Sequence, residues 1–165
     1  MKLLLVRCGG PAEKDGRVRG SAGEERPLSP EQRRLVRESA AGLASAAGEV
    51  SEVLTSPSIP AVETAAIIAK SFDVPFRELP WLDPSARIEE LLSWIGKQPA
   101  ATALVLVGHG PALTKAACRL LGGRREFLSI KPAGACMLEV DRSAEGNGAK
   151  LHWVMTPRQL RRHAK

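Results

Sequence analysis

The sequence has 165 residues, 44% hydrophobic and 25% charged, with a formal net charge of +6, and this length suits one domain with a sizeable core. No segment approaches the roughly 20 apolar residues that cross a bilayer, and the apolar stretch at the start is too short for a signal peptide, so we expect a cytoplasmic protein without membrane contact. We also expect no specific nucleic-acid binding, because no stacking aromatic residues accompany the basic ones, which fit a solvated face.

The first predicted element is a buried strand at residues 3–6, where four consecutive aliphatic residues lack the polar alternation of a half-exposed strand. The run stops at Arg7 and Cys8, and Gly9 and Gly10 follow. In open α/β sheets, ligands bind at the carboxyl ends of strands, and glycines allow the backbone to turn and to approach a ligand closely. We therefore expect a candidate site at Arg7 and Cys8.

Two helices are expected in the first half of the chain. Ser29 predicts the N-cap of the first helix, with Gln32 at the capping-box position, and Gly48 predicts its end. The second helix is expected from about residue 58 to residue 71. Pro60 falls in its first turn, where the N–H that proline lacks would have no intrahelical partner.

Strands and helices alternate along the rest of the chain. The other expected elements are a strand at 51–55, an extended segment at 72–79, a helix at 87–95, a strand at 103–107, a helix at 111–121, two antiparallel strands at 133–140 and 150–155, and a helix at 156–163. This order predicts an α/β fold, a three-layer α/β/α sandwich with a mostly parallel central sheet, in a single domain over residues 1–165.

A second candidate site follows the strand at 103–107, which ends at Gly108, His109 and Gly110. His109 occupies the place that Cys8 occupies after the first strand. If the two strands are neighbours in a parallel sheet, Arg7, Cys8 and His109 converge on one crevice. A guanidinium beside an imidazole selects for an anion, and phosphate is the natural candidate.

The three cysteines, at positions 8, 118 and 136, show no spacing typical of a metal site and form no even set. We expect neither a zinc site nor a disulfide framework, and we interpret Cys118 and Cys136 as small core residues. Trp81, in a proline-flanked loop, either lines the mouth of the crevice or packs against the sheet. We favour packing.

Three motifs follow one another along the chain: Arg7-Cys8-Gly9 after the first strand, TSPSIPAVETA at 55–65, and Gly108-His109 after a late strand. RPLS at 26–29, VLTSP at 53–57 and LHWVMTP at 151–157 accompany them. From residue 2 to about residue 160, the chain resembles the histidine phosphatase (phosphoglycerate-mutase-like) superfamily, and in particular its SixA-type phosphohistidine phosphatases. The resemblance implies a phosphoglycerate-mutase-like fold, a phosphate-bearing substrate such as a phosphohistidine protein, and neither cofactor nor metal.

The resemblance also implies roles for single residues. Arg7 and Arg26 would bind the phosphate, and His109 would bind it and stabilise the transferring group. The family's nucleophilic His is replaced here by Cys8, and its second phosphate-binding Arg by Pro60. Cys8 and His109 are thus the candidate catalytic residues, and Arg7, Arg26 and His109 the candidate phosphate ligands. For Arg26, a surface salt bridge is an equal alternative.

Cys8 has three interpretations. As a thiolate it is a nucleophile, and Arg7 and nearby amides would lower its pKa and raise the reactive fraction. Otherwise the site binds phosphate without turnover, or Cys8 is an inert small residue. Other charged side chains are candidates to replace the positive charge that Pro60 lacks, or to act as a general acid. These are Lys131, Arg17 and Arg19 for the charge that Pro60 lacks, and Glu13, Asp15 and Asp83 for a general acid.

Two functions stay open. The first is a SixA-like phosphoryl hydrolase with a diverged site, of low or no activity, acting on a phosphohistidine protein or a small phosphoester. The second is a non-catalytic module that binds phosphate or a phosphoprotein, a pseudophosphatase. Loss of a nucleophile costs on the order of 10⁶-fold in rate, and loss of one oxyanion donor about 10²–10³-fold. Ordinary turnover therefore requires that Cys8 take over the reaction.

Overall fold

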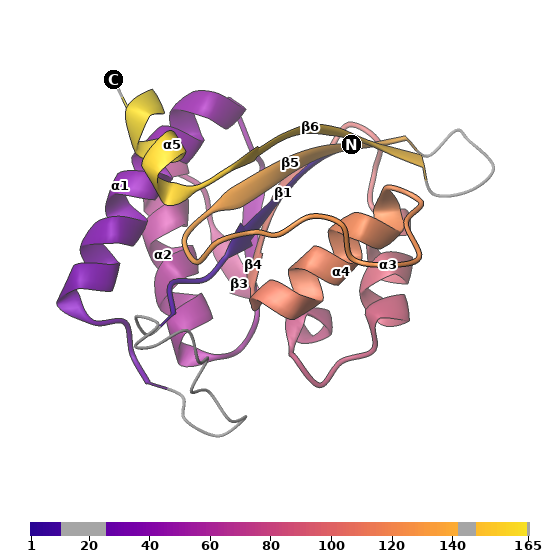
Figure 1. Ribbon diagram of the computed structural model, residues 1–165, viewed down its shortest axis with the longest axis horizontal. Coiled ribbons are helices and arrows are strands. Elements are labelled where there is room, and N and C mark those ends of the chain that lie inside the picture. The colour runs from indigo at the N-terminus through magenta and orange to yellow at the C-terminus, as the bar shows by residue number, and fades with distance from the viewer. Residues whose placement is uncertain (11–25, 142–147, 165) are drawn as a thin grey trace.

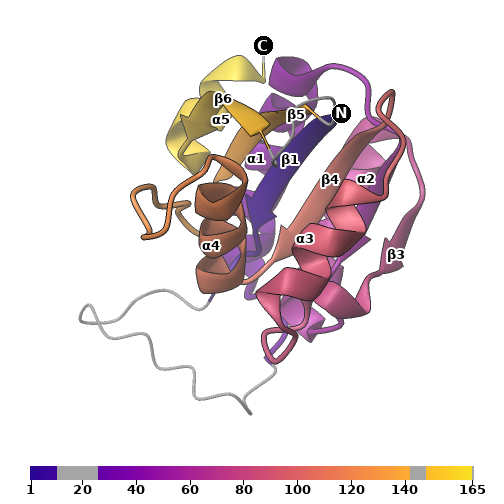
Figure 2. The ribbon, with the colours of Figure 1, turned by 90° about the vertical axis from the view of Figure 1, so that its right-hand side faces the viewer.

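The structure is a computed structural model that describes residues 1–10, 26–141 and 148–164. Its strands are β1 (Lys2–Arg7), β2 (Glu52–Thr55), β3 (Phe76–Glu78), β4 (Ala103–Gly108), β5 (Ala135–Asp141) and β6 (Gly148–Met155). Its helices are α1 (Pro30–Ala47), α2 (Ile59–Phe72), α3 (Ile88–Gly96), α4 (Gly110–Leu120) and α5 (Pro157–His163), with a short 3₁₀ turn η1 at Pro80–Leu82. The helices α1, α2 and α5 cover one face of the sheet, and α3 and α4 cover the other (Figures 1 and 2). The predicted α/β/α sandwich is confirmed.

The strand order in the described part of the chain is β3-β2-β4-β1-β5-β6. The first four strands in this order are parallel to their neighbours, and β5 and β6 are antiparallel additions beside β1. The mostly parallel sheet is confirmed, and so is the pairing of the two strands that precede the candidate site residues. Arg7 is opposite Gly108 at the carboxyl ends of β1 and β4.

Both faces of β1 are covered. Successive side chains of a strand point to opposite faces: Leu3 and Leu5 lie in the core beneath α3 and α4, and Leu4 and Val6 lie in the core beneath α1, α2 and α5. All four are buried. This burial on two sides is the physical reason for the unbroken apolar run at the start of the sequence.

The predicted helix starts follow local hydrogen bonding. The backbone N–H of Gln32 donates to Ser29 Oγ at 3.2 Å, and the N–H of Ser29 donates back to Gln32 Oε1 at 3.3 Å, which completes the capping box. Gly48 ends α1 with a positive φ of 68°, which glycine adopts without strain. In α2, Pro60 occupies the first turn, as predicted, so the proline is compatible with the helix.

Two loop predictions needed correction. Trp81 does not pack into the core: its side chain is 39% exposed, and its neighbour Leu82 is the buried residue of η1. The strand expected to start at 133 starts at Ala135, because Ala133 adopts φ of 57° and cannot continue an extended ladder. Cys118 and Cys136 are buried in the core, as predicted.

The helices α1 and α5 approach each other closely (Figure 1). A Cβ placed on Gly42 would lie 1.8 Å from the backbone oxygen of Leu160. Only glycine permits this contact. Within the described residues, no helix combines the length and the apolar composition that crossing a membrane requires.

Candidate functional site

The candidate site begins where β1 and β4 end side by side. The backbone N–H of Cys8 donates to the carbonyl of Gly108 at 2.9 Å. This bond extends the parallel pairing by one residue beyond Arg7 and places Cys8 next to the start of α4. The structure therefore brings Arg7, Cys8 and His109 to one edge of the sheet, as the sequence predicts.

Arg7 is held by contacts on two sides. Its Nη1 donates to the carbonyl of Ile130 at 3.1 Å, in the loop before β5. On the other side its guanidinium lies against the backbone of Gly110, where an added Cβ would be 2.7 Å from Nε and 2.8 Å from Cζ. A fixed positive charge thus adjoins the first turn of α4, whose exposed N–H groups also attract anions.

His109 is the N-cap residue of α4. Its Nε2 lies 2.9 Å from the hydroxyl Oγ of Ser58, the N-cap residue of α2. Ser58 is only 7% exposed. Ser58 is not among the residues that the sequence predicts for the site. A small polar residue at a helix start two positions before Pro60 was the available signal, but the same pattern is typical of an ordinary helix cap.

Cys8 is not an activated thiol in this structure. The side chain is 6% exposed and packs among apolar residues of the core beneath α1 and α2. Burial raises the pKa of Cys8 to about 11 and outweighs the lowering by the Arg7 charge and by the backbone hydrogen bond. The expected lowering is wrong, because desolvation is the larger effect.

The segment after Cys8 is tied to α2. The N–H of Gly9 donates to Thr64 Oγ1 at 3.2 Å, and the Thr64 hydroxyl donates to the carbonyl of Pro60 at 2.7 Å. These bonds fix Pro60 close to the end of β1. Pro60, the position for which the resemblance implies an arginine, therefore adjoins the candidate site.

Arg26 lies at the start of the second described segment and is exposed. The chain that follows is anchored to α2, because the N–H of Leu28 donates to Glu63 Oε2 at 2.7 Å. Glu63 also pairs with Arg33 of α1. The structure places Arg26 near the entry to α1.

Of the other charged residues considered for the site, the structure describes Lys131 and Asp83. Lys131 is exposed, in the loop that binds Arg7 through Ile130 and Ala133. Asp83 follows η1, and its pKa is lowered by hydrogen bonds from Ser85 and, more weakly, by the charge of His109. Glu13, Asp15, Arg17 and Arg19 lie outside the described residues.

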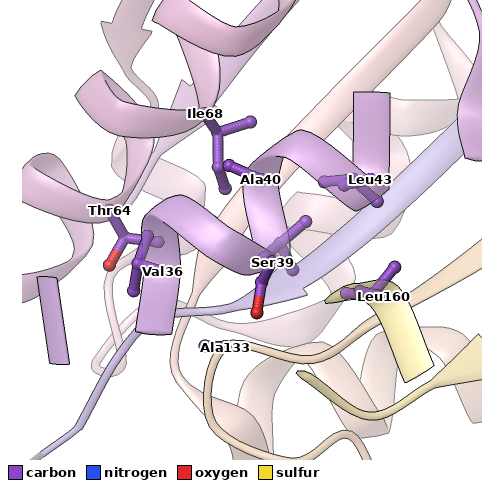
Figure 3. Close-up of a pocket in the computed structure, with 9 residues that line it drawn as sticks. Val36, Ser39, Ala40, Leu43, Thr64, Ile68, Ala133 and Leu160 are labelled. Atoms are coloured by element: carbon purple, nitrogen blue, oxygen red, sulfur yellow. The ribbon is translucent and has the colours of Figure 1, made fainter. Parts of the chain in front are cut away.

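A small cavity lies beneath α1, α2 and α5, beside the end of β1 (Figure 3). Apolar side chains of α1, α2, β1 and α5 line it, together with Ser39, whose Oγ is buried without a hydrogen-bond partner among the described residues. Neither Arg7 nor His109 lines this cavity. Among the described residues, no group of three or more His, Cys, Asp or Glu side chains is arranged to hold a metal ion.

Comparison by sequence finds no matching family model and no matching curated protein. Comparison of structures finds several matches over nearly the full length. The protein histidine phosphatase SixA, complexed with tungstate, has a TM-score of 0.80 at 20% identity and covers 97% of this chain and 99% of its own. This chain has the SixA-type histidine phosphatase fold. The alignment covers nearly all of both proteins, so the agreement extends over the complete SixA-type sandwich.

Two phosphatases of other kinds also match the SixA-type fold of this chain. The alpha-ribazole phosphatase from Shigella flexneri has a TM-score of 0.74 at 16% identity, covering 95% of this chain and 97% of its own. A mycobacterial glucosyl-3-phosphoglycerate phosphatase, in complex with VO₃, has a TM-score of 0.72 at 15% identity, covering 94% and 99%. The family resemblance inferred from the motifs is thus confirmed at the level of the fold.

Proposed function

We propose that this chain binds a phosphoryl group at the edge formed by Arg7 and His109, and that it is a phosphoryl hydrolase of low turnover. The observation that carries the proposal is the packing of the Arg7 guanidinium against Gly110, beside His109. This packing supports the proposal because a fixed cation, an imidazole and the first turn of α4 then lie at the same edge of the sheet. Such an arrangement neutralises the oxygens of a phosphoryl group.

The substrate class follows from the resemblance and the fold. A phosphohistidine protein is the first candidate, because RPLS, VLTSP and LHWVMTP resemble SixA-type enzymes and SixA is among the structural matches. A small phosphoester is the alternative, since phosphatases for small esters share the fold. Low turnover is expected because Pro60 removes one anion-binding charge, a loss of about 10²–10³-fold.

A second function, phosphate or phosphoprotein binding without turnover, is favoured by one specific observation. The thiol of Cys8 is buried and its pKa is raised to about 11, so Cys8 is a poor replacement for the nucleophilic His of the family. A receptor for a phosphorylated partner requires only Arg7, His109 and the backbone amides of this edge.

The experiment that separates these functions is phosphate release, with metal chelated, from a phosphohistidine protein and from an aryl phosphate. Arg7→Gln is compared with Arg161→Gln, which removes the same charge from an exposed residue of α5 that pairs with Glu38. The hydrolase predicts release by the wild type and by Arg161→Gln, and its loss in Arg7→Gln. Binding of inorganic phosphate with no release from either substrate would instead establish the receptor.

A further inference from the structure

Ser58 differs from the other capping residues of this chain. Ser29 and Thr156 accept hydrogen bonds from the backbone N–H three residues later, at 3.2 and 3.3 Å. Ser58 also occupies an N-cap position, yet its side chain makes no capping hydrogen bond. The Ser58 hydroxyl is instead 2.9 Å from His109 Nε2.

The sequence explains why the Ser58 hydroxyl is available. A capping side chain accepts from the N–H of the second or third helical residue. In α2 the second helical residue is Pro60, which has no N–H. The carbonyl of Ser58 still accepts the first helical bond, from the N–H of Val62 at 2.9 Å. Pro60 thus leaves the backbone of the cap intact while it removes one of the two donors that compete for the hydroxyl.

The Ser58 hydroxyl lies where an imidazole base can activate it as a nucleophile. A serine within about 2.6–3.2 Å of an imidazole nitrogen is the arrangement that activates a serine nucleophile. The residue after His109 is Gly110, against which the Arg7 guanidinium packs. A nucleophile, a base and a cation for the phosphoryl oxygens therefore meet at one edge of the sheet.

We propose that Ser58 is the phosphoryl acceptor of this site and that His109 is its base. This assignment rests on the proposed hydrolase function, and it gives that function a nucleophile in place of Cys8. In the first step, Ser58 Oγ forms a bond to phosphorus while the bond from phosphorus to the leaving nitrogen or oxygen breaks. The hydroxyl proton passes to His109 Nε2, and the leaving group takes a proton from solvent.

The second step regenerates the enzyme with water as the only co-reactant. His109, neutral again after releasing its proton to solvent, accepts a proton from water while the water oxygen forms a bond to phosphorus. The bond between phosphorus and Ser58 Oγ breaks, and Ser58 Oγ takes the proton from His109. The sum of both steps is hydrolysis to inorganic phosphate, with Arg7 beside the phosphoryl oxygens throughout.

The test uses the full chain and a small phosphoryl donor, phosphoramidate, with quenching by acid and peptide mapping by mass spectrometry. Phosphoserine survives acid, whereas phosphohistidine does not. We expect one phosphoryl group on Ser58 in the wild type. Phosphate release should fall by at least about 10³-fold in Ser58→Ala, whereas Ser51→Ala, an exposed serine at the other end of β2, should leave both label and release unchanged.

Titration with inorganic phosphate distinguishes failure of this assignment from failure of the proposed function. Binding by the wild type and by Ser58→Ala, with a label on Cys8 or with no label at all, would overturn the role of Ser58 and leave the anion site standing. Release that persists in Ser58→Ala would do the same. If the wild type neither binds phosphate nor releases it, the hydrolase and the Ser58 assignment both fail.

Discussion

The guanidinium of Arg7 lies against the backbone of Gly110 so closely that a Cβ at residue 110 would be 2.7 Å from Nε. Gly110→Ala should therefore displace Arg7 without disturbing the helix, since alanine favours helical backbone. We expect the affinity for inorganic phosphate to fall by about tenfold or more, measured by titration calorimetry. Gly96→Ala, where an added Cβ meets no atom within 4 Å, is the control. Unchanged affinity for phosphate in Gly110→Ala would mean that anion binding does not require Arg7 in this position.

Because α1 and α5 are in such close contact, we expect that adding a single methyl group at residue 42 greatly lowers the stability of the fold. A methyl group at residue 42 would lie 1.8 Å from the backbone oxygen of Leu160, and a backbone atom cannot turn aside as a side chain can. Gly42→Ala should lower the free energy of unfolding by about 3 kcal/mol or more, measured by urea denaturation. Gly96→Ala should change it by no more than about 1 kcal/mol. Similar values for both variants would contradict the close packing of α5 on α1.

The buried thiols predict a loss of stability in alkali. Burial raises the pKa of Cys8 to about 11 and that of Cys136 to about 12, from 9.0 for an exposed thiol. The unfolded chain therefore loses these protons first, and stability that is complete below pH 9 declines as the pH rises toward 11 and 12. Denaturation at a series of pH values should show this decline, and Cys136→Ala should make it shallower. If the free energy of unfolding declines with pH equally steeply in Cys136→Ala, ionisation of Cys136 does not cause the decline.

The same burial predicts slow modification of Cys8. Alkylation requires the thiolate, so iodoacetamide should label Cys8 of the folded chain much more slowly than Cys8 of the urea-unfolded chain at pH 7. Peptide mapping identifies the labelled cysteine. Rapid labelling of Cys8 in the folded chain would show an accessible thiolate, and it would revive the interpretation of Cys8 as a nucleophile.

Cys8 and Pro60 occupy the positions for which the resemblance implies a His and an Arg, and replacing both residues tests the site by engineering. Pro60 is in the first turn of α2, and only its carbonyl is used by Thr64, so an arginine fits the backbone there. Cys8→His with Pro60→Arg should raise phosphate release from a phosphohistidine protein by at least about 10²-fold over the wild type. A folded double variant without this gain would mean that other parts of the site have also diverged.

The elements that sequence reasoning predicted well share a local cause. The strand β1 is predictable from its run of apolar residues, which is typical of a strand buried on both faces. The start of α1 is predictable from Ser29 and Gln32, because a capping box needs only residues close together in the sequence. The convergence of Arg7 and His109 was also predictable, since parallel strands bring their carboxyl ends to one edge.

The failures have a common cause as well. The pKa of Cys8 depends on how completely the neighbouring helices exclude water, and the sequence indicates the charge of Arg7 but not the extent of burial. The pairing of Ser58 with His109 joins residues 51 positions apart, through a side chain that in sequence resembles a helix cap. Trp81 is exposed because Leu82, the next residue, takes the buried position in η1. Each outcome is decided by tertiary packing.

The proposed anion site at Arg7 can be tested by titration of the folded protein with inorganic phosphate and with tungstate. Arg7→Gln and Arg161→Gln change the formal charge equally, at the candidate site and on α5. We expect saturable binding to the wild type and to Arg161→Gln, and affinity at least about tenfold weaker in Arg7→Gln. Equal affinity in all three proteins, or no binding to the folded wild type, would contradict it.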